Sequence, residues 1–200
     1  MLMLLVMIAF LVVGLVRGGS LDHLADVSLH WKPLAVAGLV LQLFIFTPFR
    51  NEPLITSAIP HLYVLSMAIL AVWVFANWQI PGILLMAAGL LMNMAAIAAN
   101  GGYMPVAPEI AWISGHFRAV ATDGSAIINN SRAMSGDIRL WILTDILPVP
   151  ASIPFANVFS IGDVLLALGA GLFLYCVVRT DTPTPQVQSP IQPIVQQENS

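Results

Sequence analysis

Five long apolar runs constrain the fold of this 200-residue chain more than any other feature. A helix needs roughly 20 predominantly apolar residues to cross a hydrocarbon core about 30 Å thick. Hydrophobic residues make up 58% of the chain and charged residues 8%, which is too little charge for the surface of a water-soluble domain. The sequence therefore predicts an all-α, polytopic membrane helix bundle with about five transmembrane helices. The runs are residues 1–16, 33–49, 59–78, 81–99 and 161–178.

Basic residues avoid the interior of these runs. A charge at the bilayer centre costs about 3 kcal/mol on insertion scales, so this distribution is expected of spanning segments. The net charge of −3 is too small to indicate nucleic acid or a polybasic lipid-binding patch. No basic segment precedes run 1–16 and no A-x-A-like site follows it, so we expect a retained first helix and not a signal peptide. The seven basic residues are Arg17, Lys32, Arg50, Arg118, Arg132, Arg139 and Arg179.

The pattern divides the chain into a membrane domain, residues 1–179, and a disordered Pro/Gln-rich tail, residues 180–200. The extramembrane loop 100–160 is too long for a mere linker and is predicted to be partly helical. One helix is expected to begin at Pro108, and a second, interfacial helix is expected over residues 137–146.

Turn and cap residues predict where the helices begin and end. Ser160 and Asp163 fit a capping box at the start of the fifth helix. Ser20 is expected to cap a short helix in an interfacial segment over residues 21–31. Pro60 is expected near the start of the third helix. The short connection over residues 77–82 predicts antiparallel third and fourth helices, and small residues favour close packing of the fourth and fifth helices.

Six residues are candidates for binding, each with a structural alternative. The Asn-Gly-Gly stretch is either a helix stop or a backbone nest for a lipid phosphate or substrate carboxylate. Asp163 either caps its helix or is an intramembrane carboxylate that pairs with Arg139 or Arg17 or carries a proton. Asp145 can dock onto one of the same arginines. The six candidates are Asn100, Gly101, Gly102, Arg139, Asp145 and Asp163.

No stretch carries a catalytic or cofactor signature, so we expect no catalytic residue, cofactor or metal. His23, Asp26 and His30 would share a face on a continuous helix, which is the one pattern that allows a metal site. No cysteine or second acidic cluster supports that site. The single cysteine, Cys176, cannot form an internal disulfide.

Several motifs, taken in order, resemble the DUF5317 family of bacterial membrane proteins, to which no function is assigned. The resemblance covers about residues 1–178 and implies the same membrane architecture without adding a reaction or a ligand. The motifs are Arg17-Gly18-Gly19-Ser20, the segment 100–106, Arg139-Leu140-Trp141, the segment 145–150 and the segment 160–169.

We expect a multi-pass protein of the cell membrane, with the N-terminus outside, the C-terminus inside and the lipid bilayer as its main partner, because Arg17 follows a charge-free first helix. The first functional hypothesis is a structural, accessory or complex-forming protein whose loop meets another membrane protein. The alternative is a binder or carrier of a lipid or small amphipathic molecule, with loop 100–160 capping the bundle. A membrane enzyme would need Asp145, Asp163, Arg139 and His116 in one cavity.

Overall fold

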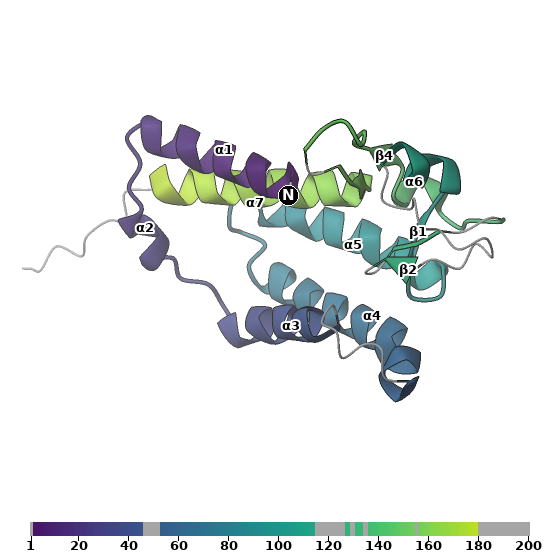
Figure 1. The fold of residues 1–200 in the computed structure, drawn as a ribbon. Coiled ribbons are helices and arrows are strands. Elements are labelled where there is room, and N and C mark those ends of the chain that lie inside the picture. Colours follow the sequence, from purple (N-terminus) through teal and green to yellow (C-terminus); the bar gives the residue numbers. More distant parts are fainter. Residues whose placement is uncertain are drawn as a thin grey trace, which may run out of the picture.

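The computed structural model describes residues 2–45, 53–114, 127–128, 131–133, 136–154 and 156–179. The described chain is mostly helical, as predicted, and carries small strands that were not predicted (Figure 1). Its helices are α1 (Leu2–Val16), α2 (Asp22–Ala25), α3 (Lys32–Ile45), α4 (Pro53–Ala76), α5 (Ile83–Ala99), α6 (Pro108–Ser114), the 3-10 helix η2 (Trp141–Leu143) and α7 (Ile161–Arg179). Its strands are β1 (Met104–Val106), β2 (Ile127–Ile128), β3 (Ser131–Ala133), β4 (Leu147–Pro148) and β5 (Val158–Phe159).

The long helices pack as neighbours in the order α1, α7, α5, α4, α3. Helices α1 and α7 run parallel, since Gly14 lies against Val178 at one end and Val6 lines a cavity with Val164 at the other. Helix α5 runs antiparallel to α7, because Gly82 faces Phe173 and Gly89 faces Leu166. The segment 17–31, the turn 77–82 and the end of α7 therefore lie at one end of the bundle, here named the α2 end.

The described residues between α5 and α7, here named the cap, lie at the other end of the bundle (Figure 1). In the cap, β1 pairs in parallel with β3, β3 pairs antiparallel with β2, and β4 pairs antiparallel with β5. Helix α6 packs against β4 and β5, and η2 packs against α5 and α7. The cap is thus a folded unit seated on two helices.

Hydrogen bonds fix the connections at the α2 end. The side chain of Asn77 accepts a bond from the backbone N–H of His30 (2.8 Å) and donates to its carbonyl oxygen (3.1 Å). The backbone N–H of Ser20 donates to the carbonyl oxygen of Val178 (2.8 Å). The Ser20 Oγ accepts from the backbone N–H of Asp22 (3.2 Å), but the predicted cap is wrong, because the N-cap residue of α2 is Leu21. The links between α1, α3 and their neighbours are therefore anchored to the ends of α7 and α4.

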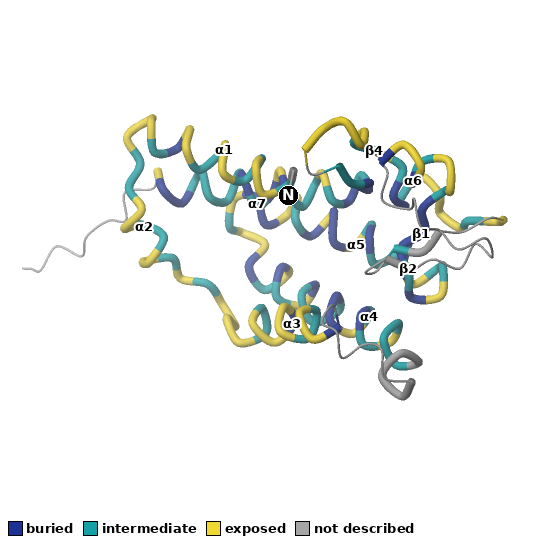
Figure 2. The backbone as a smooth tube through the Cα atoms, in the orientation of Figure 1, coloured by how far each residue is buried: buried dark blue, intermediate teal, exposed yellow. Residues whose placement is uncertain are grey.

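Two helices, Ala58–Ala76 within α4 and Ile161–Arg179, are long and apolar enough to cross a membrane. Only 22% and 28% of these segments are buried inside the protein, and the other residues are half-buried or exposed. Three shorter apolar helices accompany them, at Met3–Val16, Lys32–Ile45 and Ile83–Ala99. Exposed residues lie along these helices (Figure 2), and they include large apolar ones such as Leu43 (68% exposed).

Glycines bring α5 and α7 into backbone contact, as the small residues of these runs predicted. A Cβ at Gly89 would meet the carbonyl oxygen of Gly162 and lie 2.9 Å from the backbone nitrogen of Leu166. A Cβ at Gly169 would lie 2.7 Å from the carbonyl oxygen of Gly82. These side-chain-free positions allow the helix backbones to touch.

Two expectations about helix boundaries are wrong. Helix α4 begins at Pro53, so Pro60 lies inside it and not near its start. Proline suits the first helical position, because a backbone N–H there would have no acceptor within the helix. Segment 137–146 forms only the three residues of η2, because Leu140 adopts a left-handed conformation (φ 53°) and Asp145 pairs with β1. Pairing between distant segments outweighs the local helical pattern.

We predict that Gly89→Val destabilises the protein by about 1 to 3 kcal/mol, because the added side chain collides with the backbone of α7. The matched control is Ala88→Val, which adds two methyl groups to the adjacent, exposed position of the same helix. Thermal unfolding in detergent should show a lower midpoint for Gly89→Val alone. Equal midpoints for the two variants would refute the close contact.

Candidate functional site

A polar network joins α5 to the start of α7 beneath the cap. Asn93 Nδ2 donates to Asp163 Oδ1 (2.8 Å), and Ser160 Oγ donates to Asn93 Oδ1 (2.7 Å). Asn93 and Ser160 are buried, and Gly162 leaves the space in which the Asn93 carboxamide lies. Asn93 was not among the residues predicted from the sequence, although a lone carboxamide inside an apolar run is a signal for an interhelical hydrogen bond.

The capping box at the start of α7 is confirmed. The backbone N–H of Asp163 donates to Ser160 Oγ (2.9 Å), and the backbone N–H of Ser160 donates to Asp163 Oδ2 (3.1 Å). The alternative pairing of Asp163 with Arg139 or Arg17 is not formed, because its hydrogen-bond partners are Asn93 and Ser160. Capping and the interhelical bond occupy both carboxylate oxygens.

The helix stop at Asn100-Gly101-Gly102 is also confirmed. Gly101 and Gly102 have φ values of 74° and 86°, and the backbone N–H of Gly102 donates to the carbonyl oxygen of Ile97 (2.9 Å). Asn100 Nδ2 donates to the carbonyl oxygen of Arg139 (2.8 Å), and the backbone N–H of Arg139 donates to Asn100 Oδ1 (3.1 Å). The stop thus holds the cap through the backbone of Arg139 and not through its guanidinium. Since the Gly102 N–H is already bonded, it does not face an anion.

Asp145 is the one acidic side chain that the described structure buries, with 6% of its surface exposed. Its Oδ2 accepts a bond from Ser131 Oγ (2.9 Å), and its backbone N–H donates to the carbonyl oxygen of Pro105 (3.2 Å). Burial and, to a smaller extent, the nearby negative charge of Asp163 raise the pKa of the Asp145 carboxyl to about 7, against the opposing effect of the Ser131 hydrogen bond. Among described residues its partner is Ser131 and not an arginine.

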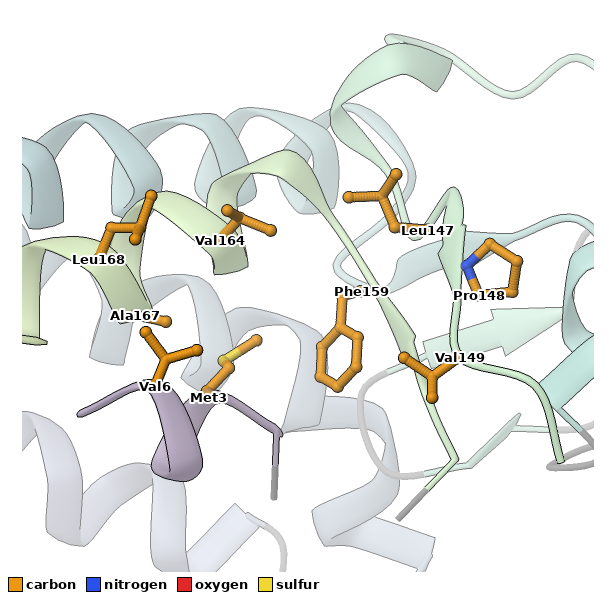
Figure 3. A pocket seen from close by; sticks show the side chains of 9 residues that line it. All are labelled: Met3, Val6, Leu147, Pro148, Val149, Phe159, Val164, Ala167 and Leu168. Carbon is orange, nitrogen blue, oxygen red and sulfur yellow. The ribbon is translucent and has the colours of Figure 1, made fainter. Parts of the chain in front are cut away.

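An apolar cavity of about 190 Å³ opens where the cap meets α1 and α7 (Figure 3). Two wall residues lie close in sequence to the acidic side chains, since Leu147 is two residues after Asp145 and Val164 is one residue after Asp163. No local motif signals this cavity, because its walls come from three segments that are distant in sequence. The lining residues are Met3, Val6, Leu147, Pro148, Val149, Phe159, Val164, Ala167 and Leu168.

The structure does not assemble the metal pattern, and it tests only part of the enzyme pattern. Helix α2 ends at Ala25, so His23, Asp26 and His30 do not share a helix face. The ring Nδ1 of His23 instead lies 2.9 Å from the carbonyl oxygen of Val178. His116, which the enzyme hypothesis requires, lies outside the described residues, as does the predicted tail 180–200.

The fold and site define a mostly helical protein with two helices able to cross a membrane, a folded cap, and a polar network beside an apolar cavity. The chain belongs to a family of unknown function, DUF5317, whose sequence model matches residues 26–176. The match includes the motifs at 100–106, 139–141, 145–150 and 160–169, and begins after Arg17-Gly18-Gly19-Ser20. No curated protein and no solved structure matches the chain.

We predict that the protein loses stability as the pH rises from about 4 to about 7. The folded-state pKa of Asp145 lies above its ordinary value of 3.8, so the folded chain binds this proton more tightly than the unfolded chain. That stabilisation is complete below pH 3.8 and is lost as the carboxyl ionises near pH 7. Thermal midpoints of the detergent-extracted protein at several pH values measure the change.

Asp145→Asn should flatten this pH dependence. At pH values above 7 it should also raise the thermal midpoint relative to the wild type, because the amide carries no charge to bury. The exposed Asp137→Asn is the matched control and should keep the wild-type profile. A wild-type midpoint that rises with pH over this interval, or an Asp145→Asn profile identical to wild type, would contradict the assignment.

Proposed function

We propose that this chain is a multi-pass protein of the cell membrane that crosses the bilayer five times. The alternating directions of α1, α3, α4, α5 and α7 support five crossings, because they place successive connections at opposite ends of the bundle. The outward apolar faces of the helices support a solvent of acyl chains. Helices α1, α3 and α5 are shorter than a typical span, which a bilayer accommodates by local thinning.

We propose that the N-terminus and the cap lie outside and the α2 end lies in the cytoplasm. Arg17, Lys32 and Arg179 lie at the α2 end, next to the helix ends where basic residues determine orientation. The arginines of the long loop count less in this rule, since long loops translocate largely regardless of charge.

Within this architecture, we propose that the protein binds the apolar tail of a lipid or small amphipathic molecule between cap and bundle. The observation that carries this proposal is the cavity of about 190 Å³ at the junction of α1, α7 and β4–β5, whose lining residues are all apolar. Apolar cavities of about 150 Å³ stay dry and accept apolar molecules.

The surroundings of the cavity suit a molecule with one polar end. The carboxyl groups of Asp145 and Asp163 lie within a few residues of the walls, and the negative charge of Asp163 raises the pKa of Asp145. A ligand with a hydroxyl, amine or other hydrogen-bonding head would find polar partners there while its tail fills the cavity.

The test is native mass spectrometry of the full chain extracted in mild detergent. We expect the wild type to retain a lipid-like or amphipathic molecule at a one-to-one ratio. Ala167→Phe and Val6→Phe, which fill the cavity from α7 and from α1, should each reduce the retained fraction at least roughly tenfold, since both remove most of the tail's burial. Ala88→Phe, on the exposed face of α5, is the control and should retain the molecule.

Equal retention by all four proteins would refute binding in this cavity. A second candidate, a complex-forming accessory protein, is favoured by exposed aromatic side chains on the cap, Trp112 (70% exposed) and Trp141 (60% exposed). A wild type that carries no small molecule but co-purifies with a stoichiometric protein partner would favour this candidate instead.

A further inference from the structure

Two arginines converge on one tyrosine at the α2 end of the bundle. Arg17 Nη1 donates to Tyr175 Oη (3.3 Å), and Arg179 Nη1 donates to the same oxygen (3.2 Å). The Arg179 guanidinium also lies over the Tyr175 ring, 5.8 Å from its centroid. Arg17 directly follows α1, and Arg179 is the last residue of α7. The parallel packing of these two helices brings both ends together.

The charge at this point is uncompensated within the described chain. Neither arginine forms an ion pair with a carboxylate of any residue that the structure describes. Two guanidinium groups that share one neutral acceptor repel each other, and they keep further N–H donors free for an anion. A phosphate, which accepts paired N–H donors from guanidinium groups, has the chemistry to bridge them.

An open groove of about 390 Å³ begins at the same residues. Arg17 and Tyr175 line its polar end, and its remaining walls are apolar: Ala9, Phe10, Val13 and Leu172. Gly171 contributes to its shape, because a Cβ there would lie 2.8 Å from the Phe10 ring. The groove thus follows the surface between α1 and α7, with cations at one end and hydrocarbon along its length.

We propose that this groove binds one anionic phospholipid, with its phosphate between Arg17 and Arg179 and an acyl chain along Phe10, Val13 and Leu172. Charge complementarity selects this occupant, because a basic pocket between helices at the cytoplasmic interface attracts anionic head groups while the adjoining wall accepts a chain. Tyr175 orients the two guanidinium groups. The site rests on the proposed membrane crossing, and it lies at the opposite end of the bundle from the cap cavity.

The test titrates the delipidated full chain in detergent with phosphatidylglycerol and, separately, with phosphatidylcholine, and counts bound lipid by native mass spectrometry. We expect one phosphatidylglycerol to bind the wild type. R17Q/R179Q should bind it at least roughly tenfold more weakly, since each cation near a phosphate contributes to affinity. K32Q removes one positive charge at the same end of the bundle without lining the groove, and should bind like the wild type.

Two further arms separate the parts of the site. Ala9→Phe fills the groove while both arginines remain, and should weaken phosphatidylglycerol binding by a similar factor. R17K/R179K keeps the charge but loses the paired donors, and should bind between the wild type and R17Q/R179Q. This milder variant keeps the proposal testable if R17Q/R179Q fails to fold, which circular dichroism reports.

Undiminished binding by R17Q/R179Q or by Ala9→Phe would overturn the proposal, as would equal binding of phosphatidylcholine. Displacement of phosphatidylglycerol by millimolar inorganic phosphate would assign the arginines to a soluble anion and equally overturn the lipid site. Labelling of the crossings is an independent measurement. A chain that crosses the membrane but binds no phosphatidylglycerol fails only this inference.

Discussion

Helices surrounded by acyl chains gain little by burying apolar side chains against one another, because lipid tails solvate those side chains equally well. In the bilayer that we propose as the solvent, contact between helices must come from close packing and from hydrogen bonds. This constraint explains why Gly89 faces Gly162 and why Asn93 binds Ser160 and Asp163 at the same junction. It also explains why the large apolar side chains cover the outer faces of the helices.

The same constraint gives the two ends of the bundle different chemistry. At the cap end, the folded cap excludes water from Asp145 and leaves an apolar cavity against α1 and α7. At the α2 end, the positively charged side chains of Arg17 and Arg179 both donate to Tyr175, and no described carboxylate pairs with them. The parallel pair α1 and α7 takes part in both sites, so one helix pair links them.

Features that depend on neighbouring residues could be predicted from the sequence. The end of α1 before Arg17, the capping box of Ser160 and Asp163, and the glycine stop after α5 follow from helix-end chemistry within a few residues. Features that depend on distant segments could not be predicted. Segment 137–146 has the composition of an interfacial helix, but pairing with β1 makes Asp145 extended. Neither the cavity nor the Arg17–Tyr175 contact, which joins residues 158 positions apart, leaves a local motif. The net charge of the chain likewise gives no indication that Arg17 and Arg179 lie close together in the folded protein.

The most direct measurement of the central claim is accessibility of single cysteines to a membrane-impermeant maleimide, with Cys176 first replaced by serine. Asp137→Cys in the cap should react in intact cells, Ser28→Cys at the α2 end should react only after the membrane is opened, and Val72→Cys on the outer face of α4 should react in neither condition. Reaction of Asp137→Cys and Ser28→Cys from the same side, or ready reaction of Val72→Cys with the aqueous reagent, would contradict helices solvated by lipid.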